Sequence, residues 1–499
     1  MQDSWRPNEK VTVEGGIRYA IWPPWYSTTN NIANFDPRFY STTNAAVINP
    51  STGRLVSGPR YNGIVLPGDG FVGEGNDLKV ASDPAVQALF RGEPRGFSQT
   101  HYDLIEPRAG VSYAWNPDTI LRGSAGIFHN RVTLNDSTLL GGNPPFQPMV
   151  AVSSGSVDNP GGVGFNNDLP FGMQGQDVVF KLPVSYMYSV GVQRQLPWKI
   201  VLDVTYVGRQ GRYLQRERNV NQLLPGTLQA NPGVNIAALR PYRGYNAIRI
   251  SENSGRSQFN SLQLSAERRY ANGFKLSFAY TYGRSWDNGS DKRNILWNSY
   301  DDANYWGLSS YDRTHVAVVS YIWDLPFWRD QSTLLRNLLG GWQISGSTFF
   351  RTGTPFSITR TNDIAGVGEG SNGQPVDLVG DIYANSNQQF SMGVVSGSAL
   401  DGNFWFNPAA FANPAQGTFG NSTRSIIRNP GDQQWDIALF KNFVLKGSHR
   451  LQFRAEVFNF INHPNLGGAN SDITSPNFGR VITKSHSPRD IQLALRYYF

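Results

Sequence analysis

At the end of the chain, apolar residues occupy every second position. Successive side chains of a β-strand point to opposite sides, so residues 489–499 would form a strand with one apolar and one polar face. The closing strand of a transmembrane β-barrel has this pattern, with its apolar face toward lipid, its polar face toward the lumen and aromatic rings at the membrane interface. A soluble β-sandwich strand can look similar, so the interpretation depends on whether the alternation recurs. The predicted barrel-closing signal consists of Ile491, Leu493, Leu495, Tyr497 and Phe499.

The same alternation recurs along the whole chain, in segments close to the ~9–11 residues that a tilted membrane strand needs. The clearest segment is 274–284, FKLSFAYTYGR, in which aromatic and aliphatic residues alternate with Lys, Ser, Ala and Thr. Residues 2–5 resemble the end of a preceding strand. Before the closing strand, the predicted strands are 11–22, 105–115, 120–131, 184–196, 198–209, 260–270, 274–284, 314–325, 342–352, 433–444 and 450–461.

The connections between these segments are alternately short and long. Turn-forming sequences at 116–119, 271–273 and 446–448 are short, whereas most other connections run for roughly 50 to 80 residues rich in Gly, Asn, Ser and Pro. Short periplasmic turns and long extracellular loops are typical of outer-membrane barrels. One turn is longer and contains, at 332–340, a predicted short helix with a Ser cap and a Gly stop. The sequence therefore predicts an all-β, antiparallel transmembrane β-barrel with about 12 strands in this chain.

Composition agrees with a barrel and excludes several other classes. The chain has 499 residues, 39% of them hydrophobic, and a mean hydropathy of −0.39. It contains no apolar run near the ~18 residues that a transmembrane helix needs, which excludes a helical membrane protein but not a barrel. The absence of Cys excludes disulfides and thiolate metal sites. The net charge of +7 is scattered, so we expect no nucleic-acid partner.

The amino-terminal residues lack the apolar region of a signal peptide. We therefore expect the chain to be a fragment or a mature segment, with residues 1–499 forming a single barrel domain.

No catalytic or cofactor-binding pattern appears. The six His residues have no metal-ligand spacing with one another. Residues 368–373 match GxGxxG but lie in a predicted loop without the strand and helix that a dinucleotide site requires. Asp69, Glu74 and Asp77 in a Gly-rich loop could bind calcium, but they lack EF-hand spacing. We therefore expect no enzyme activity, no cofactor and no metal.

Charged residues occur on the predicted polar faces of the strands and would point into the lumen. They form either a hydrated wall without further function or a mixed-sign surface that pairs with a plug through replaceable hydrogen bonds and ion pairs. These candidates are Glu14, Arg18, Glu106, Arg108, Lys199, Asp203, Glu267, Arg269, Arg351, Arg454, Glu456 and Arg496.

Several short motifs resemble, in their order and spacing, the carboxy-terminal barrel of TonB-dependent outer-membrane receptors, especially the Oar-like branch. The match covers essentially the whole chain. The motifs are QDSW (2–5), EPRAG (106–110), GVQRQLP (191–197), DRTH (312–315), GWQISG (341–346), RTGTPF (351–356), FRAEVFN (453–459), NHPN (462–465) and the terminal 491–499.

The resemblance implies a 22-stranded barrel with an amino-terminal plug and a TonB box, powered by the proton gradient of the inner membrane. It also implies outer-membrane lipid, TonB, the barrel-assembly machinery and an unidentified bulky substrate as partners. The chain departs from this pattern because it contains no plug and no TonB box, and only about the last twelve strands.

The leading hypothesis is thus the carboxy-terminal barrel portion of a TonB-dependent transporter in the outer membrane of a Gram-negative-type bacterium. Two alternatives remain open. One is a self-contained passive pore, and the other is a surface adhesin or structural barrel that binds through its long loops.

Overall fold

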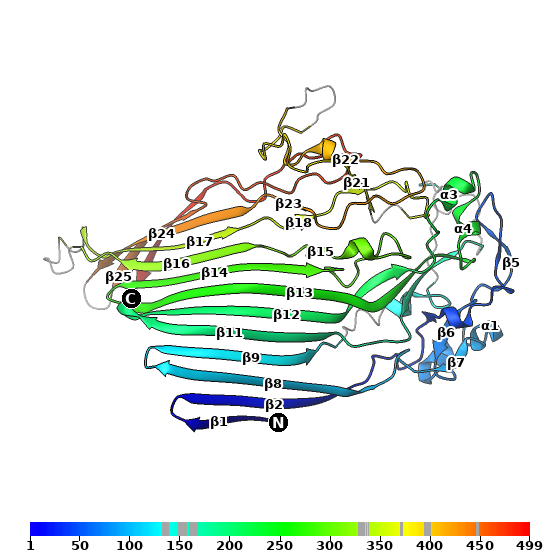
Figure 1. Cartoon of the computed structure of the whole chain (residues 1–499), viewed down its shortest axis with the longest axis horizontal. Coiled ribbons are helices and arrows are strands. Elements are labelled where there is room, and N and C mark those ends of the chain that lie inside the picture. The colour runs from blue at the N-terminus through cyan, green and yellow to red at the C-terminus, as the bar shows by residue number, and fades with distance from the viewer. Residues whose placement is uncertain are drawn as a thin grey trace.

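A computed structural model gives the structure of the chain (Figure 1). It describes residues 1–131, 139–147, 157–158, 168–327, 335, 337, 339–369, 373–393, 401–445 and 449–499.

One large sheet forms the body of the molecule. It contains 15 strands, and all but β10 and β15 follow one another in a continuous antiparallel path from β1 to β26. Along this path the strands are β1 (Gln2–Asn8), β2 (Val11–Trp22), β8 (His101–Asn116), β9 (Thr119–His129), β11 (Val184–Leu196), β12 (Ile200–Asn219), β13 (Tyr245–Ala271), β14 (Phe274–Asp287), β16 (His315–Asp324), β17 (Trp342–Arg351), β24 (Asp432–Val444), β25 (Arg450–Phe458) and β26 (Asp490–Tyr498).

The strands appear in the order that the alternation predicts, and residues 2–5 indeed belong to a strand, β1, that pairs with β2. The antiparallel all-β fold is confirmed. The strands lie along the long axis of the molecule, with the short turns and the carboxyl terminus at one end and the long loops at the other (Figure 1). We call these the short-turn end and the long-loop end.

Two strands are much longer than predicted. β12 has 20 residues and β13 has 27, and their ladder continues from Ile200–Arg268 to Asn219–Arg249 with register shifts near Leu214. The prediction of a loop of roughly 50 residues between 209 and 260 was therefore wrong. Apolar alternation fades beyond residue 211 because the pair continues past the expected membrane section, where both faces can be polar.

The start of β12 also differs from the prediction. Trp198 and Lys199 lie in the turn between β11 and β12, both with φ of 62°, in the left-handed region. The strand begins at Ile200, so the prediction that Lys199 faces the lumen from within a strand was wrong.

The long loops contain short elements of their own. The helices are α1 (Pro84–Gln87), α3 (Thr227–Ala230) and α4 (Ile236–Leu239), with 3-10 turns at Pro37–Phe39, Gly73–Asp77, Leu139–Gly142, Pro197–Lys199, Ala303–Tyr305 and Pro408–Ala410. The remaining strands are β3 (Asn34–Phe35), β4 (Val47–Ile48), β5 (Leu55–Ser57), β6 (Ile64–Pro67), β7 (Phe90–Glu93), β10 (Phe171–Gln176), β15 (Gly307–Leu308), β18 (Pro355–Phe356), β19 (Thr359–Arg360), β20 (Gln374–Pro375), β21 (Asp377–Leu378), β22 (Phe411–Ala412) and β23 (Ile427–Arg428).

Among the residues described, no helix is long and apolar enough to cross a membrane. The helix predicted at 332–340 and the turn predicted at 446–448 lie wholly or mostly outside the described residues.

The two largest buried apolar cores lie at the long-loop end and consist mainly of loop residues. A first core, which we call cap 1, joins the loop after β2 to β10 and the long-loop end of β13 through residues such as Phe35, Leu66 and Ile248. A second core, cap 2, joins the loop after β17 to the loop after β25 through Phe406, Phe411 and Phe478. Both caps sit at the long-loop end, and the sequence did not predict them.

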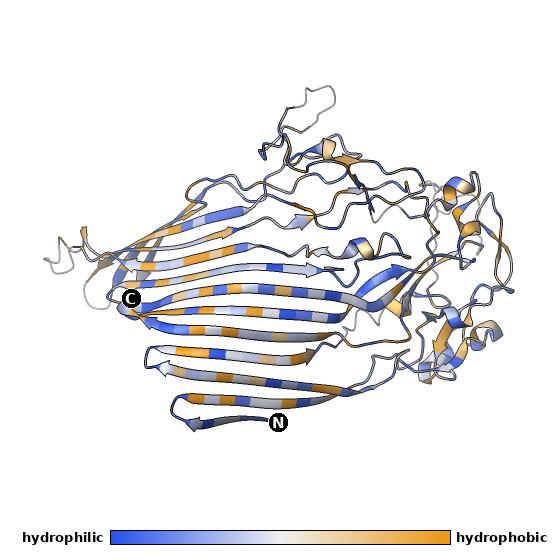
Figure 2. Ribbon diagram, viewed as in Figure 1, coloured by the Kyte–Doolittle hydropathy of each residue, from blue (hydrophilic) through white to orange (hydrophobic). Residues whose placement is uncertain are grey.

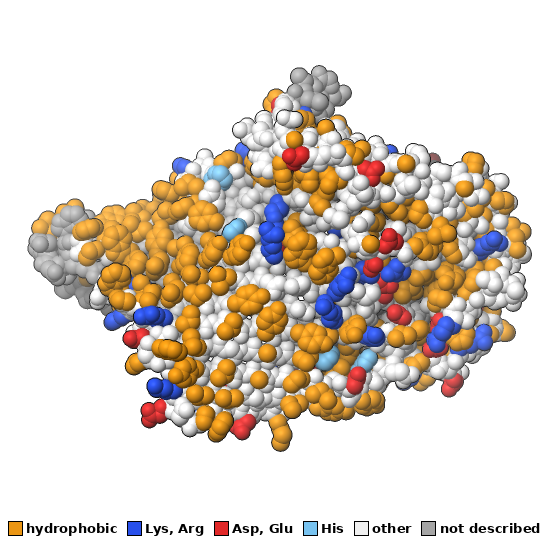
Figure 3. Space-filling model, in the orientation of Figure 1, with side chains coloured by type: hydrophobic (Ala, Val, Ile, Leu, Met, Phe, Trp, Pro, Cys, Tyr) orange, Lys and Arg blue, Asp and Glu red, His pale blue; other side chains and the backbone are white. Residues whose placement is uncertain are grey.

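The sheet itself exposes its apolar side chains. Leu493 in β26 is 65% exposed, and the rows of exposed aromatic and aliphatic residues continue across the neighbouring strands. Orange residues alternate with blue or pale residues along most of the long strands in Figure 2. In the space-filling view, hydrophobic side chains crowd toward the short-turn end, and charged side chains gather toward the long-loop end (Figure 3). This distribution fits a sheet whose apolar face meets lipid.

The exposed apolar face generates a prediction for Leu493→Arg. A lipid-facing Arg near the middle of a membrane strand costs about 2–4 kcal/mol, so this variant should lower the free energy of unfolding in lipid vesicles by that amount. The measurement is a urea titration of the vesicle-inserted protein, monitored by tryptophan fluorescence.

The matched control is Gln492→Arg, one residue earlier and on the opposite face, in register with Glu456. It should leave the unfolding free energy nearly unchanged. Equal destabilisation by both variants would contradict the assignment of the two faces.

Candidate functional site

The face of the sheet opposite the exposed apolar rows is lined by small and polar residues. Residues in register across neighbouring strands share a face. One such row runs across seven strands from β2 to β14. It consists of Glu14, Gly110, Ser124, Ser189, Val207, Ser261 and Gly283. We call this face the inner face.

Two grooves are hollowed into the inner face. The first has a volume of about 420 Å³, and its lining includes Glu14, Arg108, Ser124 and Ser189. The second has a volume of about 340 Å³, and its lining includes Lys275, Ser345, Asp436 and Glu456. The sequence proposed Glu14, Arg108 and Glu456 as lumen residues, and the structure places them in these grooves.

Arg18 and Glu106 come together across β2 and β8. Their Nη1 and Oε2 atoms are 3.5 Å apart, and Glu106 is only 4% exposed. Glu106 also accepts a hydrogen bond of 2.8 Å from the backbone N–H of His129 in β9. A buried carboxylate needs such partners, so Glu106 ties three strands together near the long-loop end.

Some of the other charges that were predicted to face the lumen form an ion pair or hydrogen bond within their own strand, and some form none. Arg454 and Glu456 in β25 are 3.3 Å apart, and Asp203 accepts a 2.6 Å hydrogen bond from the hydroxyl of Thr205. Within the described part of the chain, five of the predicted charges have no side-chain hydrogen bond or ion pair. They are Glu14, Arg108, Glu267, Arg269 and Arg496.

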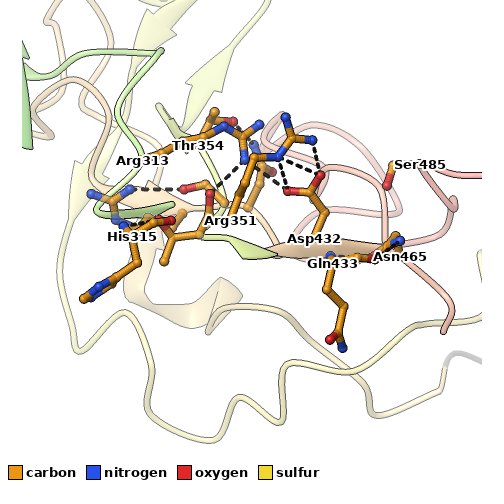
Figure 4. Close-up of polar contacts among 12 residues, drawn as sticks. Arg313, His315, Arg351, Thr354, Asp432, Gln433, Asn465 and Ser485 are labelled. Atoms are coloured by element: carbon orange, nitrogen blue, oxygen red, sulfur yellow. Dashed lines mark hydrogen bonds and ion pairs between the residues drawn. The ribbon is translucent and has the colours of Figure 1, made fainter. Parts of the chain in front are cut away.

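Arg351 belongs to a cluster at the long-loop end of β16, β17 and β24. The guanidinium of Arg351 lies against the carboxylate of Asp432, its partner in the β17–β24 register. Arg313 Nη1 is 3.1 Å from Asp432 Oδ1 and also donates to the Thr352 carbonyl at 2.9 Å. Figure 4 shows the carboxylate of Asp432 beside the guanidinium of Arg351, whereas Gln433 points to the other side of the strand. This cluster fixes the first residues of cap 2.

Sequence reasoning proposed Arg351 but missed Asp432 and Arg313. The position of Asp432 could have indicated its role. It directly precedes the strand predicted at 433–444 and would share the polar face of that strand with Gln434 and Asp436. Arg313 lies in a loop, where alternation gives no information.

A second ion-pair network lies where β12 and β13 meet the loops. Arg216, 2% exposed, contacts Glu252 at 3.2 Å and also pairs with Asp302. Arg218 contacts Glu252 at 2.8 Å, and Arg424 of cap 2 pairs with Asp287 at the end of β14. Sequence reasoning missed this network because the region reads as an unstructured loop.

Two loop residues of this network have shifted pKa values. The hydrogen bond from Arg216 lowers the pKa of the Asp302 carboxyl, with a further contribution from the nearby arginine charges. Burial, together with the proximity of Arg216, lowers the pKa of Arg424 to about 10. Both residues remain charged at neutral pH, so the network joins cap 2 and the loop after β14 to the sheet by ion pairs.

The described residues contain no group of three or more His, Asp or Glu side chains that could hold a metal. Residues 370–372 of the GxGxxG match lie outside the described part, and Asp69, Glu74 and Asp77 lie in the loop after β2.

Comparison with known proteins gives one family match. The model of a family described as "Outer membrane beta barrel domain" matches residues 1–492. No curated protein sequence matches the chain.

Solved structures are similar at low identity. The outer membrane transporter YddB from Escherichia coli has a TM-score of 0.41 and 11% identity, over 79% of this chain and 40% of its own. The FrpB iron transporter from Neisseria meningitidis has a TM-score of 0.38 and 10% identity, over 100% and 54%. The siderophore receptor PirA from Acinetobacter baumannii has a TM-score of 0.39 and 11% identity, over 80% and 41%. The chain therefore spans about half or less of the length of these proteins.

The Asp432 cluster generates the second prediction. The Asp432→Ala substitution removes the carboxylate that Arg313 and Arg351 share. Because both arginines are partly exposed, the free energy that holds the start of cap 2 against the sheet should fall by about 1–3 kcal/mol. Native-state proteolysis should then cleave cap 2 near residues 352–360 faster than in the parent. Glu9→Ala, in an exposed turn, is the control and should leave the cleavage rate unchanged. Unchanged protection in Asp432→Ala would refute this role.

The lowered pKa of Asp302 generates a third prediction. Because its folded-state pKa lies below its unfolded value of about 3.9, its contribution to stability is complete above that pH and is lost as the pH falls through the folded-state pKa. The protection of the loop around 294–305 against hydrogen exchange, corrected for the slower intrinsic exchange in acid, should therefore fall as the pH falls. Asp302→Asn should show faster exchange already at neutral pH and a weaker acid response. The same acid response in both proteins would contradict the role of Asp302.

Proposed function

The chain belongs to the outer membrane β-barrel domain family, and from this premise we propose that it is the carboxy-terminal barrel portion of a TonB-dependent transporter of the Oar-like branch. Its location is the outer membrane of a Gram-negative-type bacterium. In this assignment residues 1–499 form one barrel domain, the long-loop end faces outward, and the short turns face the periplasm. The complete protein would move a bulky substrate inward or outward with energy transmitted by TonB.

One observation carries the proposal. The inner face is broad, polar and lined by small residues, and five of its charges lack side-chain partners within the described chain: Glu14, Arg108, Glu267, Arg269 and Arg496. Charges of both signs on a hydrated wall suit a large polar plug. Such contacts can be exchanged for water at little cost, so the plug could be displaced.

The partners follow from the same assignment. Outer-membrane lipid would surround the apolar face, the barrel-assembly machinery would insert the sheet, and TonB would act through a region outside this chain. The proposed barrel has no enzymatic role.

The direct experiment expresses the protein together with its natural upstream coding region and tests binding of the periplasmic domain of TonB. Specific co-purification that depends on the upstream region supports the proposal. If that region encodes neither a plug nor a TonB-binding segment, the proposal fails. Steady ion conductance by the purified chain alone would instead support a passive pore.

A second candidate function is surface binding through the caps. Cap 1 and cap 2 have their own buried cores, and a connecting loop does not need such cores. Replacing residues 356–426 with a short linker would test this candidate. Loss of attachment with intact uptake would favour an adhesin, whereas loss of uptake with unchanged attachment would favour the transporter.

A fourth prediction concerns plug retention. Reversing two unpaired inner charges, in Arg108→Glu with Arg269→Glu, should weaken plug contacts and make cells more sensitive to a large antibiotic that an intact outer membrane excludes. The control reverses Arg6, an exposed arginine of the same charge near the short-turn end of β1, and should leave sensitivity at the parent level. Unchanged sensitivity of the double variant, with normal amounts of folded protein, would count against a plug held by this wall.

A further inference from the structure

A third cavity lies on the opposite side of the sheet from the two grooves. It has a volume of about 740 Å³ and lies between cap 2 and the apolar face of β14, β16, β17 and β24. Its floor is a single register row formed by Tyr280, Ala317, Phe350 and Gln433. These residues share the face of Phe278 and Val319, so the floor lies on the lipid side of the sheet, and the lining reaches Arg351 and Asp432 where β17 and β24 meet the loops.

The depth of the floor fits the outer half of the membrane. Tyr280 is six residues beyond Phe274, the first residue of β14 at the short-turn end. At about 3.3 Å per residue along a strand tilted by about 40°, this places the floor in the upper part of the ~25 Å apolar band. From there the cavity extends upward past His315, Thr352 and Gly353 to cap 2.

The chemistry of the cavity is aromatic and polar without free charge. Phe350 is 39% exposed and meets Trp435 edge-on at 5.5 Å between ring centroids. Tyr383, 46% exposed, and Trp405 of cap 2 form the opposite wall. The two arginines of the lining, Arg351 and Arg428, are both already paired with Asp432 and Asp312.

Hydrogen-bonding groups are available between these rings. In the part of the chain that the structure describes, the side chains of Gln388 and His463 have no hydrogen-bond partner. The Nδ1 atom of His315 lies 2.8 Å from the Tyr280 hydroxyl, which orients its ring within the cavity. Sugar rings present C–H faces that pack on aromatic rings, and their hydroxyls bond to amide and imidazole groups.

We propose that this cavity binds the sugar headgroup of an outer-leaflet glycolipid, with the acyl chains lying on the apolar strand surface below. The neutral, aromatic lining selects a sugar over an isolated phosphate, and the position on the lipid-facing wall selects a membrane lipid over a soluble saccharide. The bound glycolipid would join cap 2 to the sheet directly beside the Asp432 cluster, whose Arg351 and Asp432 line the same cavity.

The test uses the protein purified from outer membranes. Native mass spectrometry measures the binding of added lipopolysaccharide, phosphatidylethanolamine and the free core oligosaccharide after endogenous lipid is removed. The variants are Tyr383→Ala, whose exposed side chain has no described hydrogen bond, and Phe350→Ala. The control is Tyr206→Ala, an exposed aromatic of the same lipid-facing surface on β12.

The parent should bind lipopolysaccharide more tightly than phosphatidylethanolamine or the free oligosaccharide. Each cavity variant should bind lipopolysaccharide about threefold to tenfold more weakly, the range expected for one aromatic contact, and the control should match the parent. Undiminished binding in both cavity variants would overturn the proposal. Equal binding of the free oligosaccharide or of phosphatidylethanolamine would overturn the assignment of a glycolipid.

Discussion

The structure depends on one constraint, that backbone N–H and C=O groups inside a bilayer must form hydrogen bonds within the protein. The antiparallel path from β1 to β26 meets this constraint, because every inner strand is paired on both sides. Within the described chain, β1 and β26 each have a single strand neighbour, so in lipid their free edges need a partner. With the backbone satisfied by the ladder, side chains are free to alternate between lipid and water.

That division explains why the buried cores lie in the loops. Lipid covers the apolar face of the sheet, so Leu493 and its neighbours need no protein core, and water or a polar plug covers the Gly- and Ser-rich inner face. The caps stand in water, and they must bury their own apolar residues, such as Phe35 and Phe406. Ion pairs of Asp432 with Arg313 and Arg351, and of Arg424 with Asp287, then fix cap 2 to the sheet. The pair between Arg216 and Asp302 fixes the loop after β14.

The strands could be predicted from the sequence where contact with lipid imposes an alternation of apolar and polar residues. They could not be predicted where the strands extend beyond the lipid. The segment 274–284 and the closing strand have clear period-two alternation, and both were placed within a few residues. β13 was predicted at less than half its length, because residues such as Glu252 continue the ladder beyond the expected bilayer, where polar side chains can occupy both faces. Cap 1 was missed because Phe35, Leu66 and Ile248 are scattered over more than two hundred residues and meet only in three dimensions. Asp432 was missed because its role depends on its neighbour in β17.

A spin-label scan would show whether one face of the sheet meets lipid and the other meets water. Single nitroxide labels are placed at each position from 274 to 284 in the membrane-inserted protein, and their accessibility to oxygen and to a water-soluble relaxation reagent is measured. We expect opposite oscillations with a period of two residues, with oxygen favoured at Phe274, Leu276 and Phe278. Uniform accessibility to the water-soluble reagent along the whole segment would contradict it.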